Sequence, residues 1–146
     1  MKKVCILITL MYSVLITAQT LTGNLKHHAG QQINLTGFNY YQTIELAKDT
    51  IDGAGNFTLN YPKDYKGMGV LNTQDNNSLV LMLTEPNIQL KGIHVTEADS
   101  LVYSNSNNNT LFLNYAKARG IREAAWVALK YLQPLYQDQK ELQNQT

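Results

Sequence analysis

Cysteine is nearly absent from this 146-residue sequence. The single cysteine, Cys5, lies in an apolar stretch at the N-terminus, so the rest of the chain carries no thiol. Without a thiol, that part of the chain cannot form a disulfide, use a thiolate nucleophile or bind zinc through sulfur. Its fold therefore depends on an apolar core alone, and thiol redox chemistry is excluded from it.

A basic patch is also missing. The whole chain has 12 Lys and Arg against 11 Asp and Glu, and removal of Lys2 and Lys3 leaves 10 against 11. Nucleic-acid binding and binding to anionic membranes both depend on clustered positive charge. We therefore expect no nucleic-acid partner.

A long apolar run occurs only once, at residues 4–18, directly after the paired lysines. A positive start followed by an apolar run and then polar residues is typical of a cleavable secretory leader. Cleavage is expected after Ala18 or Gln19, which makes residues 1–19 a signal peptide. The run is too short for a comfortable membrane span, so we expect export and no stable membrane anchor after cleavage.

Catalytic motifs are lacking as well. No serine stands in a G-x-S-x-G setting, the carboxylates are scattered, and Gly67-Met68-Gly69 lacks the third glycine of a dinucleotide loop. His27 and His28 are adjacent, so on a strand they point to opposite faces, and His94 is distant with no evident acidic companion. We expect solvent-exposed loop histidines, no metal, no cofactor and no enzymatic activity.

Short alternating segments separated by turn residues fill residues 20–105. Phe57, Leu59 and Tyr61 alternate with polar residues, which is typical of a strand with one buried face. Strands of about five residues that recur every ten or so predict a mainly β domain, either a small antiparallel β-sandwich or an open barrel. The predicted strands are 21–25, 33–38, 43–51, 57–61, 68–71, 79–83 and 88–93.

The turns predict which strands pair. We expect 21–25 to pair with 33–38 across the loop at Ala29-Gly30, and 43–51 to form a hairpin with 57–61 across the dense turn at 52–56. A further turn is expected at Asp75-Asn76-Asn77.

The period changes to that of a helix in residues 106–146, which we expect to form a helical connector or tail. Asn108 or Asn109 is the expected N-cap, and Gly120 is expected to end a first helix. A second helix should begin near Arg122, and Pro134 should kink or split it.

Four tyrosines mark a candidate ligand or docking surface. Tyr40, Tyr41, Tyr61 and Tyr65 lie at or near predicted strand ends and loops. A tyrosine ring offers a large apolar face with a polar tip, which suits stacking on a sugar or gripping a peptide. The alternative is that these rings cover the edge of the core.

The order of these features resembles a known family across residues 20–143. The chain is similar to the N-terminal domain of unknown function that precedes the thioredoxin-like domain in periplasmic thiol-disulfide oxidoreductases of the TlpA and AhpC/TSA type. The residues that carry the resemblance are Leu21-Thr22-Gly23-Asn24-Leu25, Ile33-Asn34-Leu35, the 51–57 turn, Leu81 to Glu85, Ile88 to Gly92, Arg122-Glu123 to Ala128, Tyr131-Leu132 and Tyr136.

The family's redox activity belongs to a C-x-x-C pair in the downstream domain, and this sequence contains no such pair. The resemblance therefore implies a non-catalytic accessory domain, periplasmic or outer-membrane-associated in a Gram-negative bacterium. Its implied partner is a thioredoxin-like domain or that domain's substrate protein. The alternative is a stand-alone β module that binds a peptide or glycan, and an enzyme of unrecognised type is a further rival.

Overall fold

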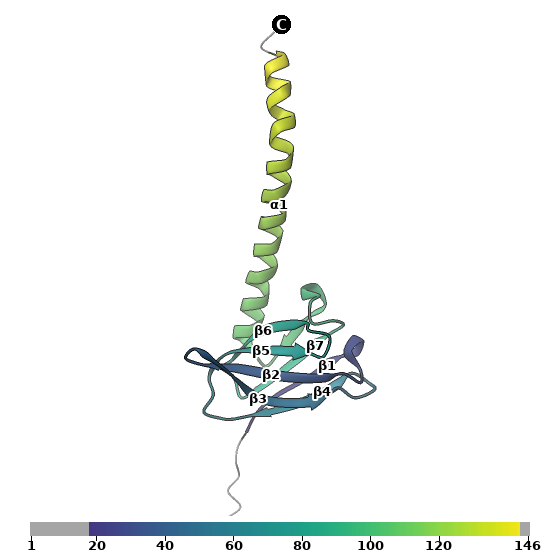
Figure 1. The fold of residues 1–146 in the computed structure, drawn as a ribbon, viewed down its shortest axis with the longest axis vertical. Coiled ribbons are helices and arrows are strands. Elements are labelled where there is room, and N and C mark those ends of the chain that lie inside the picture. Colours follow the sequence, from purple (N-terminus) through teal and green to yellow (C-terminus); the bar gives the residue numbers. More distant parts are fainter. Residues whose placement is uncertain (1–17, 144–146) are drawn as a thin grey trace, which may run out of the picture.

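The computed structural model describes residues 18–143, so most of the predicted leader, including Cys5, lies outside the described residues. Strands dominate the fold, and one long helix follows them (Figure 1). The strands are β1 (Gln19–Leu25), β2 (Gln32–Asn39), β3 (Gln42–Thr50), β4 (Asn56–Tyr61), β5 (Gly67–Thr73), β6 (Ser78–Leu83), β7 (Asn87–Gly92) and β8 (Val102–Ser104). The helices are the short 3-10 turns η1 (Lys26–His28) and η2 (Ala98–Ser100) and the α-helix α1 (Asn107–Gln143).

The strands form two four-stranded sheets, with the orders β4-β1-β7-β8 and β3-β2-β5-β6. Neighbouring strands are antiparallel except β1 and β7, which run parallel. The chain crosses between the sheets after β1, β3, β4 and β6. The predicted mainly β architecture is confirmed, and it takes the form of a β-sandwich with a helical tail.

The core lies between the sheets and follows the predicted alternation. In β4, Phe57, Leu59 and Tyr61 are buried, whereas the residues between them are exposed. In such a strand every second side chain enters the core, because successive side chains point to opposite faces. The fully buried aliphatic core is Leu21, Leu25, Ile33, Leu35, Ile51, Leu59, Leu71, Leu81, Leu83, Ile88 and Leu90.

Two predicted pairings are wrong. β1 pairs with β4 and β7 and not with β2, because residues 26–31 carry the chain from one sheet to the other. β3 and β4 do not form a hairpin, because they lie in different sheets and the turn between them is also a crossover. Alternation shows which face of a strand is buried, but it is identical for strands of one sheet and of two facing sheets.

The predicted turn at 52–56 is present and is held by one carboxylate. Asp52 Oδ1 accepts hydrogen bonds from the backbone N–H groups of Ala54 at 2.9 Å and Asn56 at 2.7 Å. Gly55 takes φ +91°, and a Cβ there would lie 2.9 Å from the Cα of Lys26. The turn therefore needs both the acceptor at 52 and the glycine at 55.

Because of this turn, we expect the folded chain to lose stability in acid. The hydrogen bond from the Asn56 N–H, followed by the bond from its side chain, lowers the pKa of Asp52 below its ordinary 3.8. A lowered pKa stabilises the fold above pH 3.8, and that stabilisation is lost as the pH falls through the folded-state value. In urea titrations at pH 7 and below pH 3.8, Asp52→Asn is expected to show a smaller acid-induced loss of unfolding free energy than wild type. The control Asp64→Asn, at an exposed site, should keep the wild-type loss, and an unchanged loss in Asp52→Asn would contradict this role.

The helix differs from its prediction. α1 runs without interruption from Asn107 to Gln143, through both Gly120 and Pro134. A glycine inside a helix costs only about 1 kcal/mol relative to alanine, and the Arg119–Glu123 ion pair at 2.7 Å spans Gly120 on the helix surface. Pro134 removes one hydrogen bond, and the helix continues beyond it. The break predicted at Gly120 and the split predicted at Pro134 are therefore wrong.

Candidate functional site

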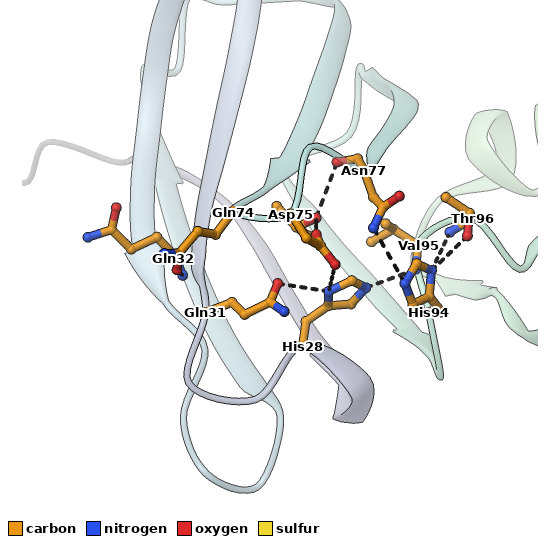
Figure 2. A network of polar contacts seen from close by, with 10 residues as sticks. His28, Gln31, Gln32, Gln74, Asp75, Asn77, His94, Val95 and Thr96 are labelled. Carbon is orange, nitrogen blue, oxygen red and sulfur yellow. Dashed lines mark hydrogen bonds and ion pairs between the residues drawn. The ribbon is translucent and has the colours of Figure 1, made fainter.

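Three turns at one end of the sandwich bring polar side chains together. β1 and β7 are parallel neighbours with Leu25 opposite Gly92, so their C-terminal ends lie at the same edge of the sheet. His28 follows β1 and His94 follows β7, and the β5–β6 turn of the other sheet carries Asp75 (Figure 2). The ring centroids of His28 and His94 are 4.3 Å apart.

His28 is fully buried, whereas the adjacent His27 is exposed. Its Nδ1 lies 3.0 Å from Gln31 Oε1 and 3.7 Å from Asp75 Oδ2, and its Nε2 accepts a long hydrogen bond of 3.4 Å from the Val95 N–H. These contacts favour the neutral tautomer in which Nδ1 carries the proton and donates a hydrogen bond to Gln31 Oε1. Both ring nitrogens therefore face polar atoms inside the sandwich.

Asp75 lies in the tight turn predicted between β5 and β6, where Asn76 adopts φ 62°. The Thr73 hydroxyl donates to Asp75 Oδ1, while Asp75 Oδ2 faces His28. The Thr73 hydrogen bond is the main cause that lowers the pKa of the carboxyl, and the Asn77 side chain is a smaller cause. The carboxylate is therefore ionised at neutral pH and has a buried imidazole beside it.

His94 is half-buried in the loop that follows β7. Its Nδ1 accepts a hydrogen bond from the Thr96 backbone N–H at 3.2 Å and lies 2.7 Å from the Thr96 hydroxyl, and these contacts fix the ring. Its Nε2 lies 3.5 Å from Asn77 Nδ2. Since that contact is long, Nε2 is the less firmly held nitrogen of the ring.

One ligand atom from each of His28, Asp75 and His94 lies within 4.8 Å of the others. The expectation of solvent-exposed loop histidines is wrong for His28, which is buried beside Asp75, and the expectation that His94 has no acidic companion is wrong because Asp75 lies in the same cluster. Sequence reasoning missed the cluster because the three residues are far apart in the chain. Only the pairing of β1 with β7 indicates that these residues meet, and the alternation of apolar residues in the sequence does not reveal that pairing.

The structure does not bring the four tyrosines to one surface. Tyr61 is buried, and its hydroxyl donates to the Glu85 carbonyl at 3.3 Å, so its ring belongs to the core. Burial, with a smaller effect of the Glu85 charge, raises the pKa of Tyr61 to about 12. Tyr65 packs over Gly37, where a Cβ would lie 2.5 Å from the ring, and its hydroxyl bridges the Phe38 N–H and the Met68 carbonyl.

Tyr40 and Tyr41 have a different environment. They form the two-residue loop between β2 and β3, and their side chains are 95% and 103% exposed. Tyr40 adopts φ 53°, which is unusual for a bulky residue and costs on the order of 1–3 kcal/mol. The ligand-binding surface stays a prediction, and these two are its exposed rings.

A second feature is the helix α1, which extends away from the sandwich (Figure 1). Its contacts with the β domain involve β6, β8 and η2. Beyond these contacts it carries large exposed apolar side chains, including Trp126 at 59% and Leu129 at 56% exposure. Within residues 18–143, no helix combines the length and apolar character needed to cross a membrane. Within residues 107–132 of α1, the large exposed apolar side chains are Leu111, Tyr115, Ile121, Trp126, Val127, Leu129, Tyr131 and Leu132.

Comparisons with known proteins identify no family. No family model and no curated protein matches the sequence. Among solved structures, a 9R-lipoxygenase from Cyanothece PCC8801 is similar over 57% of this chain and 20% of its own, with 11% identity and a TM-score of 0.36. The chain thus spans about a fifth of that protein, and a likeness this distant carries no functional argument.

Proposed function

We propose that this chain is a non-catalytic extracytoplasmic accessory module that docks a thioredoxin-like domain, or that domain's substrate protein, through helix α1. The observation that carries the proposal is the apolar surface of α1 beyond its contacts with the sandwich. A helix with apolar residues around its circumference is normally buried against other protein. Exposed apolar surface of this kind is typical of interaction sites.

The run at residues 124–129 (Ala-Ala-Trp-Val-Ala-Leu) lies on every side of the helix because six consecutive residues cover more than one turn. Trp126, Val127 and Leu129 are all more than half exposed. Trp is among the residues most often found at the energetic centre of interfaces. This segment of the helix is therefore the proposed docking site.

The resemblance to domains that precede thioredoxin-like domains supplies the partner. Export is proposed from the leader-like composition of residues 1–19. The lack of a thiol after Cys5 supports an accessory role, because such a module would leave the redox step to its partner. The rival peptide- or glycan-binding module has two exposed rings at one hairpin tip to support it.

Trp126 makes the docking test direct because it is the single tryptophan of the chain. The chain without the proposed leader, residues 20–146, is titrated with a purified thioredoxin-like domain of the TlpA type while tryptophan emission is recorded. Docking is expected to give a saturable blue shift, because the exposed indole would leave water. Leu129→Glu should weaken binding by at least about tenfold, since a charge would be buried without a partner.

Tyr40→Ser is the matched control, because it alters the exposed hairpin tip and leaves α1 intact. It should keep the wild-type titration curve. Dilution of the chain alone measures self-association. The proposal is overturned if the emission does not move on titration, or if the same shift depends on the chain's own concentration.

A further inference from the structure

We propose that His28, Asp75 and His94 bind a divalent first-row transition-metal ion that joins the two sheets at one end of the sandwich. This inference goes beyond the docking function and is independent of helix α1. It depends on the geometry of three turns, their donor atoms and the contacts that orient them (Figure 2).

The donor set selects the class of ion. Two imidazoles and one carboxylate are borderline N and O ligands, which suit Zn²⁺, Cu²⁺, Ni²⁺ or Co²⁺ better than the oxygen-seeking Mg²⁺ and Ca²⁺. Three protein ligands leave a further coordination position. The Asp75 side chain is 40% exposed, so water can reach that position.

The spacing is close to that of a bound site. In a tetrahedral zinc site with bonds of about 2.0–2.1 Å, ligand atoms lie about 3.3 Å apart. Here they lie within 4.8 Å of one another, so closure needs shifts of about 1 Å or slightly more. His94 and Asp75 are both in connections between strands and are partly exposed, so they can move by this amount while buried His28 stays in place.

A second contact orients the His28 ring as in metal sites. A metal-bound histidine normally gives its other ring N–H to an oxygen atom, which fixes the tautomer. Gln31 Oε1 lies 3.0 Å from His28 Nδ1 and suits this role, whereas His94 Nδ1 accepts a hydrogen bond from the Thr96 N–H at 3.2 Å. The opposite nitrogens of both rings make only long contacts, of 3.4 and 3.5 Å. Each imidazole thus has one nitrogen that is held and one that is weakly engaged.

The position of the cluster gives the ion a structural role. His28 and His94 extend from the β4-β1-β7-β8 sheet, and Asp75 belongs to the hairpin of the opposite sheet. The chain after Cys5 has no cysteine and therefore no disulfide between its sheets. A bound ion would supply a cross-link of that kind and would stabilise the folded chain by mass action.

The test uses the tag-free chain without the proposed leader, residues 20–146, stripped with a chelator and titrated with ZnCl₂ by isothermal calorimetry. One ion per chain is expected, with MgCl₂ giving no heat of binding. The melting temperature should rise with zinc and return to its starting value with chelator. Co²⁺ should give visible ligand-field bands, which report nitrogen and oxygen coordination directly.

Substitutions of the proposed ligands test whether the ion binds at this cluster. His94→Gln and Asp75→Asn should each weaken zinc binding by at least about tenfold, and both side chains are exposed enough for the variants to fold, as far-UV circular dichroism would verify. His27→Gln and Asp64→Asn are the matched controls, because they remove an exposed histidine and an exposed carboxylate outside the cluster. Both controls should bind zinc within about twofold of wild type.

Zinc binding that is equally strong in His94→Gln and Asp75→Asn would place the ion elsewhere and overturn the proposal. A dissociation constant weaker than about 1 mM in the wild type would also overturn it. Neither result bears on the emission titration, so failure of the metal site and failure of helix docking are distinguishable.

Discussion

Replacing Leu71 with alanine is expected to lower the free energy of unfolding by about 3 kcal/mol. Leu71 is fully buried in β5, the strand between β2 and β6, and it pairs with Leu35 on one side and Leu79 on the other. The substitution removes buried methyl groups and leaves a cavity that two flanking strands prevent from closing. Domains of this size are stable by only about 5–15 kcal/mol, so the loss is a large fraction of the total.

Urea unfolding of the chain, followed by far-UV circular dichroism at sheet wavelengths, measures this effect. Tryptophan emission is unsuitable because Trp126 lies on exposed α1 and does not report the core. The matched control is Leu111→Ala, since Leu111 is 67% exposed, and it should change the unfolding free energy by less than about 0.5 kcal/mol. Equal losses in the two variants would mean that the core does not lie between the sheets.

Asn109→Ala is expected to lower the unfolding free energy by about 2 kcal/mol, because it removes hydrogen bonds that connect α1 to the sandwich. Asn109 is 1% exposed. Its Oδ1 accepts from the Met82 N–H at 2.7 Å, and its Nδ2 donates to the Met82 carbonyl at 2.7 Å and to Ser106 Oγ at 2.8 Å. The amide thus pairs with edge strand β6 as a further strand would.

Asn109→Asp separates this pairing from simple packing. Aspartate keeps the size of the side chain but places an oxygen against the Met82 carbonyl, where Asn109 has its donor. It should destabilise at least as much as alanine above the pKa of the new carboxyl. Asn107→Ala is the control, because Asn107 is exposed on the same first turn, and it should stay near wild type. A loss in Asn109→Ala no larger than in Asn107→Ala would contradict the role of the amide.

The start of α1 was predicted from the local sequence to within a few residues, but its capping residue was not. Asn108 or Asn109 was the predicted N-cap, whereas the Ser106 hydroxyl accepts from the Asn109 N–H at 3.4 Å and also donates to Glu85 Oε2 at 2.9 Å. The position of the helix was thus found within a few residues, because polar capping residues gather at a helix start. The choice among them depends on Glu85, which comes from another part of the chain.

The sequence alone determined the features that depend on neighbouring residues. The alternation of Phe57, Leu59 and Tyr61, the turn at 52–56 and the helical period after 106 follow from side-chain direction and backbone preference, which act within a few residues. The leader-like composition of residues 1–19 is of the same local kind, and it lies largely outside the described residues.

Only the tertiary structure decided which strands share a sheet and which polar groups meet. Tyr61 became a core residue and Tyr40 an exposed one, although both are tyrosines near strand ends. His28, Asp75 and His94 came together because β1 lies parallel to β7 and the opposite sheet closes over their ends. Such contacts join residues tens of positions apart, and their free energy comes from burial across the whole sandwich, which a local pattern does not encode.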